Sequence, residues 1–137
     1  MFILLKIIHF LALIFGAAAS FGNIYLALSA GPHDLAAPGF TNTLRKFYRL
    51  TALGAITVLW ITGLLLMVWQ YGLWIEGFAF NAKIMLAVVL TAIIFFLNLM
   101  APGWARSGGP PSYVPVLHWV GSFCLIGIVV FAVAAFN

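Results

Sequence analysis

Three ionisable side chains lie inside apolar stretches of this sequence: His9, Lys83 and His118. A polar group in hydrocarbon is costly, so it marks either a functional site or a hydrogen bond between helices. An imidazole can ligate a metal or act as a base, and an ammonium group pairs with anions. We therefore assign His9 and Lys83 as candidate catalytic residues, all three as candidate cofactor-binding residues, and His9 as the candidate metal ligand.

The composition predicts an integral membrane protein. Of the 137 residues, 66% are hydrophobic and 6% are charged, against about 45–50% and about 25% in soluble domains. This length accommodates one membrane domain, residues 1–137, and no soluble catalytic domain beside it. The net charge of +4 comes without a basic run, which excludes a nucleic-acid-binding protein and leaves lipid, other membrane proteins or further copies of the chain as partners.

Several reaction classes are excluded by missing motifs. The sequence has no Gly-rich phosphate loop, no nucleophile elbow and no HExxH motif. Its acidic residues, Asp34 and Glu76, both fall in predicted loops, so a proton relay through membrane carboxylates is not expected. Cys124 is the single cysteine, which excludes an intrachain disulfide and a cysteine-based zinc site.

The apolar segments predict helices at residues 7–29, 47–70, 82–101 and 114–136. Each is long enough to cross a hydrocarbon core of about 30 Å at about 1.5 Å per residue. With short connections, they predict an all-α fold, a four-transmembrane-helix bundle with antiparallel up-down topology. The expected end signals are Asn42 or Thr43 as the cap of the second helix, Asn81 as the cap of the third, Pro102-Gly103 as its stop, and Pro115 in the first turn of the last.

The helix directions predict the depth of each candidate residue. His9 lies one turn beyond Lys6 on the first helix, and Lys83 lies near the start of the third, which runs in the same direction. His118 starts the oppositely directed fourth helix, about 20 Å from the level of His9 by helix rise. His9 and His118 of one chain therefore cannot be the two axial ligands of one haem. A single haem would use His9 with Lys83, with water or with a vacant position, and His118 would have a separate role.

Small and polar residues form stripes that should face protein rather than lipid. On the first helix Gly16, Ser20 and Asn23 follow the direction of His9. The comparable faces are Thr51, Ala55 and Thr62 on the second helix, and Lys83, Ala87, Thr91 and Asn98 on the third. Because small residues permit close helix packing, a packing hydrogen bond is the alternative role for both His9 and His118, and headgroup contact is the alternative for Lys83.

Basic residues predict the orientation. The connections after the first and third helices carry Arg45, Lys46, Arg49 and Arg106, whereas the opposite side carries Lys6 and Lys83 beside Glu76. The positive-inside rule then places both termini on the non-cytoplasmic side. The expected location is the bacterial inner membrane.

The sequence resembles the small membrane proteins that include HemJ-type protoporphyrinogen oxidases and CopD-like proteins. The likeness rests on residues 5–9, Leu-Lys-Ile-Ile-His; on Trp60 with Gly63 and Leu64; and on residues 80–84, Phe-Asn-Ala-Lys-Ile. It covers about three helices. In that family the first-helix histidine and the third-helix lysine are functional positions and the proteins are associated with b-type haem, so the resemblance implies these roles for His9 and Lys83.

The leading hypothesis is a membrane protein that binds haem b or a related porphyrin, with His9 as axial ligand or base and Lys83 near a propionate or opposite the metal. If the chain is an enzyme, it would be an oxidoreductase that removes electrons from a porphyrinogen. The alternative from another class is a non-catalytic accessory or assembly subunit of a larger respiratory or photosynthetic complex. Metal transport is a weaker third hypothesis, because Met67, Met85 and Met100 show no ladder spacing.

Overall fold

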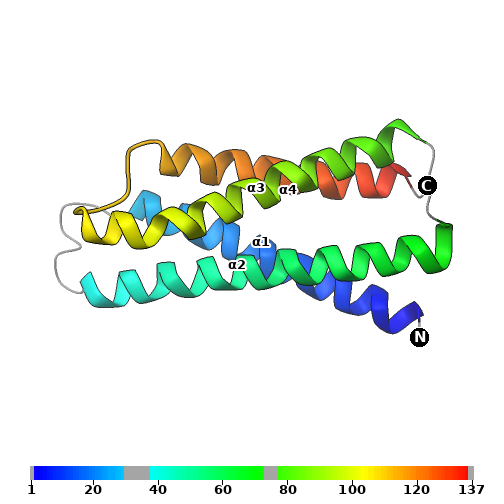
Figure 1. Ribbon diagram of the computed structural model, residues 1–137, viewed down its shortest axis with the longest axis horizontal. Helices are drawn as coiled ribbons and strands as arrows, with labels where there is room; N and C mark the ends of the chain where they lie inside the picture. The colour runs from blue at the N-terminus through cyan, green and yellow to red at the C-terminus, as the bar shows by residue number, and fades with distance from the viewer. Residues whose placement is uncertain (1, 30–37, 73–76, 136–137) are drawn as a thin grey trace.

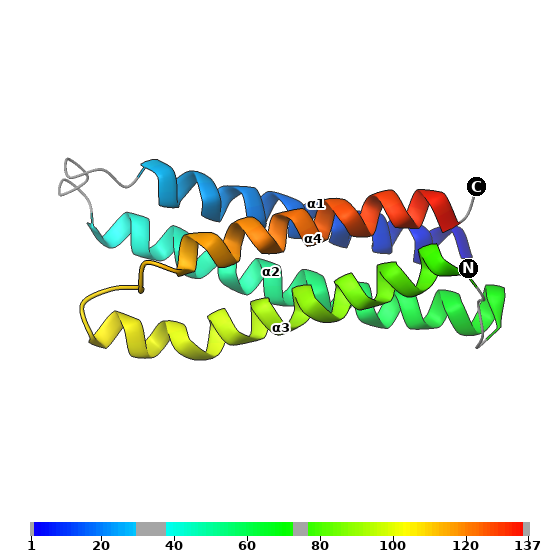
Figure 2. The same cartoon turned by 90° about the horizontal axis from the view of Figure 1, so that it is seen from above.

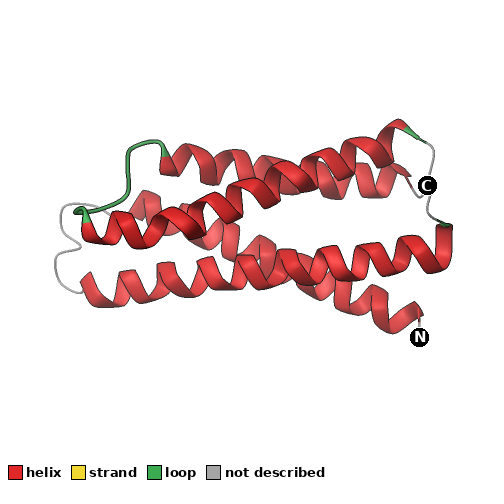
Figure 3. Cartoon of the chain, viewed as in Figure 1, coloured by secondary structure: helices red, strands yellow, loops and turns green. Residues whose placement is uncertain are grey.

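The computed structural model describes residues 2–29, 38–72 and 77–135, and within these ranges all regular structure is helical (Figure 3). The helices are α1 (Phe2–Ser29), α2 (Pro38–Leu66), which continues as the π-helix η2 (Met67–Tyr71), α3 (Phe78–Arg106) and α4 (Val114–Ala135). The predicted all-α four-helix class is confirmed.

All four α-helices are long and apolar enough to cross a membrane. Their outward surfaces carry large apolar side chains, such as Phe78, of which 82% is exposed, and Ile3, of which 75% is exposed. Such a surface is stable in lipid and not in water, because burying apolar area is what stabilises a soluble fold. The chain is therefore an integral membrane protein in contact with the bilayer.

The bundle consists of two helical hairpins. The colour gradient shows that each helix runs opposite to the one before it and that the start of α1 and the end of α4 lie at one end of the bundle (Figures 1 and 2). The most extensive contacts are within the hairpins, between α1 and α2 and between α3 and α4. The hairpins meet through smaller contacts between α1 and α4 and between α2 and α3.

Glycines allow the helices of each hairpin to approach closely. A Cβ atom on Gly22 of α1 would lie 2.7 Å from Cζ of Tyr48 on α2, and a Cβ atom on Gly127 of α4 would lie 2.8 Å from Cδ1 of Leu86 on α3. Small residues at helix contacts are the usual means of close packing in membranes, where lipid is as apolar as the side chains. The central core is small and consists of Ile56, Leu90, Cys124 and Leu125.

In the part of the chain that the structure describes, hydrogen bonds between side chains connect the helices in three places. His9 and Thr62 join α1 to α2 at 2.7 Å, Trp60 and Thr91 join α2 to α3 at 2.8 Å, and Ser20 and Ser122 join α1 to α4 at 2.7 Å. Interhelical hydrogen bonds in membranes contribute about 0.6 kcal/mol on average. The polar stripes predicted on the first three helices therefore do face protein at these positions.

Three helices begin earlier than predicted. α1 begins at Phe2 instead of residue 7, α2 at Pro38 instead of residue 47, and α3 at Phe78 instead of residue 82. The predicted caps are wrong as a result, because Asn42, Thr43 and Asn81 lie inside helices. The Thr43 hydroxyl donates to the carbonyl of Gly39 at 2.9 Å, and the backbone N–H of Asn81 donates to the carbonyl of Gly77 at 3.2 Å. Hydropathy detects the hydrocarbon-spanning part of a helix and not its extension into the headgroup region.

The predicted stop at Pro102-Gly103 is also wrong, because α3 continues to Arg106. A proline removes one ladder hydrogen bond, but here the ladder resumes, since the carbonyl of Gly103 accepts from the backbone N–H of Ser107 at 3.1 Å. Near the end of a membrane helix water can satisfy the freed carbonyl. Pro115 lies in the first turn of α4 as predicted. The end of the fourth predicted helix, residue 136, lies outside the described residues.

Candidate functional site

His9 is held by a threonine of the neighbouring helix. Its Nδ1 lies 2.7 Å from Oγ1 of Thr62, a residue of which only 4% is exposed. The Thr62 hydroxyl also lies 2.7 Å from the carbonyl oxygen of Val58, one turn earlier on α2. A carbonyl only accepts, so the single hydroxyl proton is donated to Val58 and Thr62 accepts a hydrogen bond from Nδ1–H of His9.

This arrangement selects the nitrogen of His9 that is available for a ligand. In the neutral imidazole it fixes the proton on Nδ1 and leaves the lone pair on Nε2. Within residues 2–29, 38–72 and 77–135, no side chain forms a hydrogen bond to Nε2. Histidines that bind metals usually donate their other ring N–H to an oxygen in this way, which orients the ring and raises its basicity as a ligand.

A cavity of about 100 Å³ adjoins the imidazole and lies between the two hairpins. Its walls are largely apolar and come from all four α-helices, with Trp60 and Gly63 from α2 and Leu125 from α4. A Cβ atom on Gly63 would lie 3.6 Å from Cε1 of His9, so the ring packs on the backbone of α2. An apolar cavity with a few convergent polar groups is the usual form of a ligand site.

Lys83 enters the same cavity from α3. His9 and Lys83 are close enough for their charges to interact. Helix direction predicts that His9 and Lys83 lie at one level, and the structure brings them together at one cavity. Their catalytic and cofactor-binding roles remain predictions.

His118 does not join this group. It is half-buried near the start of α4, and it is absent from the described lining of the His9–Lys83 cavity. Its electrostatic neighbour is Arg45 of α2, at the end of the bundle where α2 and α4 begin and α3 ends (Figure 1). The structure thus separates His118 from the other two candidates, and its predicted role in cofactor binding stays a prediction.

Two threonines are hydrogen-bond partners of site residues, which the sequence did not predict. Thr62 was placed on a protein-facing stripe, but not as the partner of His9. Thr91 repeats its arrangement: it donates to the carbonyl of Ala87 at 2.6 Å and stands 2.8 Å from the indole Nε1–H of Trp60, from which it accepts. A hydroxyl that donates its proton within its own helix can only accept a hydrogen bond from a neighbouring helix. In the sequence, the signal for such a pair is a threonine at the same predicted depth as a histidine or tryptophan of another membrane helix.

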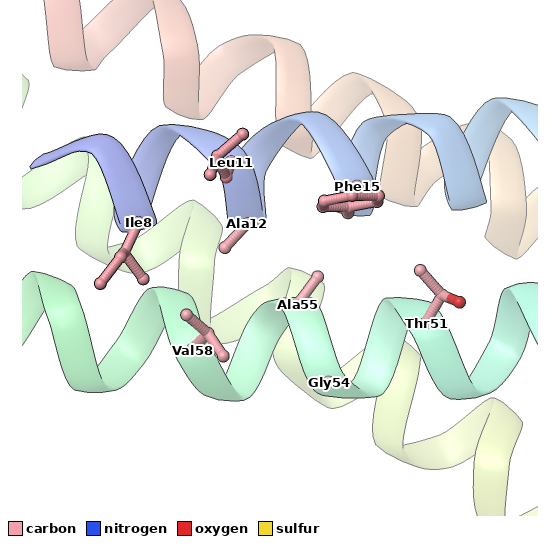
Figure 4. A pocket seen from close by; sticks show the side chains of 8 residues that line it. All are labelled: Ile8, Leu11, Ala12, Phe15, Thr51, Gly54, Ala55 and Val58. Atoms are coloured by element: carbon pink, nitrogen blue, oxygen red, sulfur yellow. The ribbon is translucent and has the colours of Figure 1, made fainter. Parts of the chain in front are cut away.

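A larger hollow lies apart from the ionisable groups. This groove of about 310 Å³ runs between α1 and α2, where Ala12 and Ala55 face each other and Gly54 adds no side chain (Figure 4). Its lining is apolar except for Thr51. It offers contact area but no group for acid–base or ligand chemistry.

The described part of the chain contains no group of three or more His, Cys, Asp or Glu side chains that could hold a metal ion. A metal that arrives already held by a macrocycle needs only an axial donor, which His9 can supply.

Comparison of the chain with models of known protein families, with curated proteins and with solved structures found no match.

Proposed function

We propose that this integral membrane protein binds haem b or a related porphyrin between its two helical hairpins, with Nε2 of His9 as the axial donor. The observation that carries the proposal is the hydrogen bond between Nδ1 of His9 and Thr62, which leaves the lone pair of Nε2 available on a ring that lines a largely apolar cavity. The resemblance to HemJ-type and CopD-like proteins points to His9 and Lys83 and forms part of the same proposal.

The imidazole of His9 is a suitable ligand for haem iron, but the cavity beside it is too small for a porphyrin ring. A porphyrin belongs to the class of ligands that occupy pockets of about 300–1,000 Å³, and the cavity measures about 100 Å³. Binding therefore requires α2 and α3 to move apart. Contacts there are sparse compared with those inside each hairpin, and the side-chain hydrogen bond found between these helices in the described residues joins Trp60 and Thr91.

Lys83 would bind an anionic group of the ligand. Its ammonium is a compact charge with three donors, which suits a propionate carboxylate. A bound haem would supply one-electron chemistry, and the chain would hold it, orient it and exclude water.

An absorption spectrum of the protein purified in mild detergent tests the proposal. We expect a Soret band after expression with haem supply, and a shifted or missing band in His9→Ala. A His118→Ala variant, altered at the other end of the bundle, should retain the wild-type spectrum. Absence of the band, or an identical band in His9→Ala, would refute haem binding through His9.

The second candidate function is a non-catalytic accessory or assembly subunit of a larger respiratory or photosynthetic membrane complex. The groove between α1 and α2 favours it, since Ala12, Gly54 and Ala55 leave room for the close approach of another helix. Copurification with a stoichiometric membrane partner, without a pigment in this chain, would support that function and contradict the haem proposal.

We also propose the orientation given by the positive-inside rule, with both termini on the non-cytoplasmic side of a bacterial inner membrane. The start of α1 and the end of α4 lie at the same end of the bundle (Figure 1). Cysteine labelling of a variant with Cys124 replaced and a cysteine added at either terminus would test the side. Labelling from the cytoplasmic side alone would contradict it.

A further inference from the structure

The end of the bundle opposite His9 and Lys83 carries an excess of positive charge. Of the six lysines and arginines in the chain, Arg45, Lys46 and Arg49 lie in the first half of α2, and Arg106 lies in the last turn of α3. These parts of α2 and α3 lie at the same end (Figure 1). The chain has only two acidic residues, Asp34 and Glu76, which are too few to neutralise these four basic side chains.

Two of these arginines share one face of α2. Arg45 and Arg49 are four residues apart, so they lie one above the other, and both are half-buried, whereas Lys46 between them is exposed. The nearness of Arg45 to His118 of α4 indicates that this face looks toward the other helices. Nε of Arg49 is buried and has no hydrogen-bond partner among the described residues. Buried donors in folded proteins are nearly always paired, so an acceptor is missing here.

The depth of these arginines matches the level of lipid headgroups. α4 has 22 residues and measures about 33 Å, close to the thickness of the hydrocarbon core, so its first turn lies at the boundary. α2 has 29 residues and η2 adds 5 more, so the two measure about 50 Å along their axis. This is longer than the hydrocarbon core, so part of α2 extends into the headgroup region. Trp104 and Tyr113, in edge-to-face contact at 6.2 Å, mark the same level.

We propose that Arg45 and Arg49 bind the phosphate of an anionic phospholipid headgroup at this end of the bundle. A guanidinium matches a phosphate with two parallel hydrogen bonds, and Nε is one of its donors. A lipid is favoured over a soluble anion because Leu50, which follows Arg49 on α2, exposes large apolar surface that can receive an acyl chain. Basic sites between membrane helices characteristically select anionic headgroups.

Native mass spectrometry of the full-length protein, released from detergent with phosphatidylglycerol or with phosphatidylcholine, tests this proposal. We expect a retained phosphatidylglycerol adduct, with affinity lower by about fivefold in Arg45→Gln and again by about fivefold in Arg45→Gln/Arg49→Gln, since each basic residue near a membrane surface contributes a factor of this size. Arg49→Lys should keep more affinity than Arg49→Gln. Lys46→Gln, which alters the exposed neighbour, and Lys6→Gln, at the other end, should behave like the wild type.

Three results would overturn the proposal. Equal retention of the two lipids would show that charge does not select the ligand. A loss in Lys46→Gln as large as that in Arg45→Gln would show diffuse attraction without a site. Displacement of the adduct by millimolar inorganic phosphate would show that a soluble anion is the ligand. Circular dichroism at the helical bands identifies variants that fail to fold. If the double variant fails to fold, the single variant Arg45→Gln still tests the site.

Discussion

Thr62 accepts a hydrogen bond from Nδ1 of His9 across 2.7 Å while it donates its own proton to the carbonyl of Val58 at 2.7 Å. The threonine thereby sets the tautomer of the histidine, and it does so from a different helix. In the apolar interior of a membrane protein neither group has water as a substitute partner. The pair therefore ties the packing of α1 on α2 to the chemistry available at the cavity.

The first prediction concerns this pair. Thr62→Val has nearly the same shape but no acceptor, so Nδ1–H of His9 loses its partner and the ring loses its fixed orientation. Loss of such a partner costs about 10–100-fold in metal-ligand affinity, so haem affinity measured by titration should fall by that factor. Thr57→Val is the matched control, because the Thr57 hydroxyl is exposed and bonds only to the carbonyl of Leu53 in its own helix. Equal affinity in the two variants would contradict the role of Thr62.

A second prediction separates the role of Lys83 from simple packing. Lys83→Gln should lower the affinity for haem by about tenfold, the usual scale for a hydrogen bond to a charged group. It should leave the affinity for haem dimethyl ester unchanged, because that ligand has no carboxylate to pair. Lys6→Gln should change neither value. A loss of the same size for both ligands would assign Lys83 to packing.

The third prediction concerns access to the cavity. Trp60→Phe removes the hydrogen bond between Nε1 of Trp60 and Thr91, so α2 and α3 should separate more easily. Loss of about 0.6 kcal/mol of interhelical hydrogen bonding corresponds to about a threefold faster uptake of haem in stopped-flow absorbance. Trp119→Phe alters an exposed indole of α4 and should leave the rate unchanged. A slower rate in Trp60→Phe would argue against entry between the hairpins.

A fourth prediction tests the packing of the first hairpin. Gly22→Ala places a methyl group 2.7 Å from the Tyr48 ring, so the ring must move, and overpacking of this kind costs about 1–3 kcal/mol. Thermal unfolding in detergent should show the loss. Gly54→Ala is the control, because nothing lies within 4 Å of its added carbon. If both variants unfold at the wild-type temperature, Gly22 is not a close contact.

The sequence predicts the membrane-spanning segments and the common depth of His9 and Lys83 better than it predicts the helix ends and the hydrogen-bond partners of the site. Long apolar runs identify the four helices, and helix direction alone brings His9 to the level of Lys83. Asn42, Thr43 and Pro102 mislead as end signals, because backbone helicity continues through them into the region where water is available. Capping and helix-breaking residues therefore predict helix ends less well where a helix extends beyond the hydrocarbon core of the bilayer.

The pairing of His9 with Thr62 and the size of the cavity depend on the rotation of each helix about its axis. Apolar side chains cover every face of these helices, so the hydrophobic pattern contains little information about rotation. The stripes of small residues indicate only roughly which side of each helix faces the other helices. The exact contacts follow from close approaches such as Gly22 on Tyr48, which appear only in three dimensions.

The most direct measurement is ligand rescue in the cavity. In His9→Gly the loss of the side chain leaves space for free imidazole beside the porphyrin position. We expect a Soret band in the wild type, its loss or shift in His9→Gly, and its return when imidazole is added. A wild-type spectrum in His9→Gly without imidazole, or no haem spectrum in any form of the protein, would contradict it.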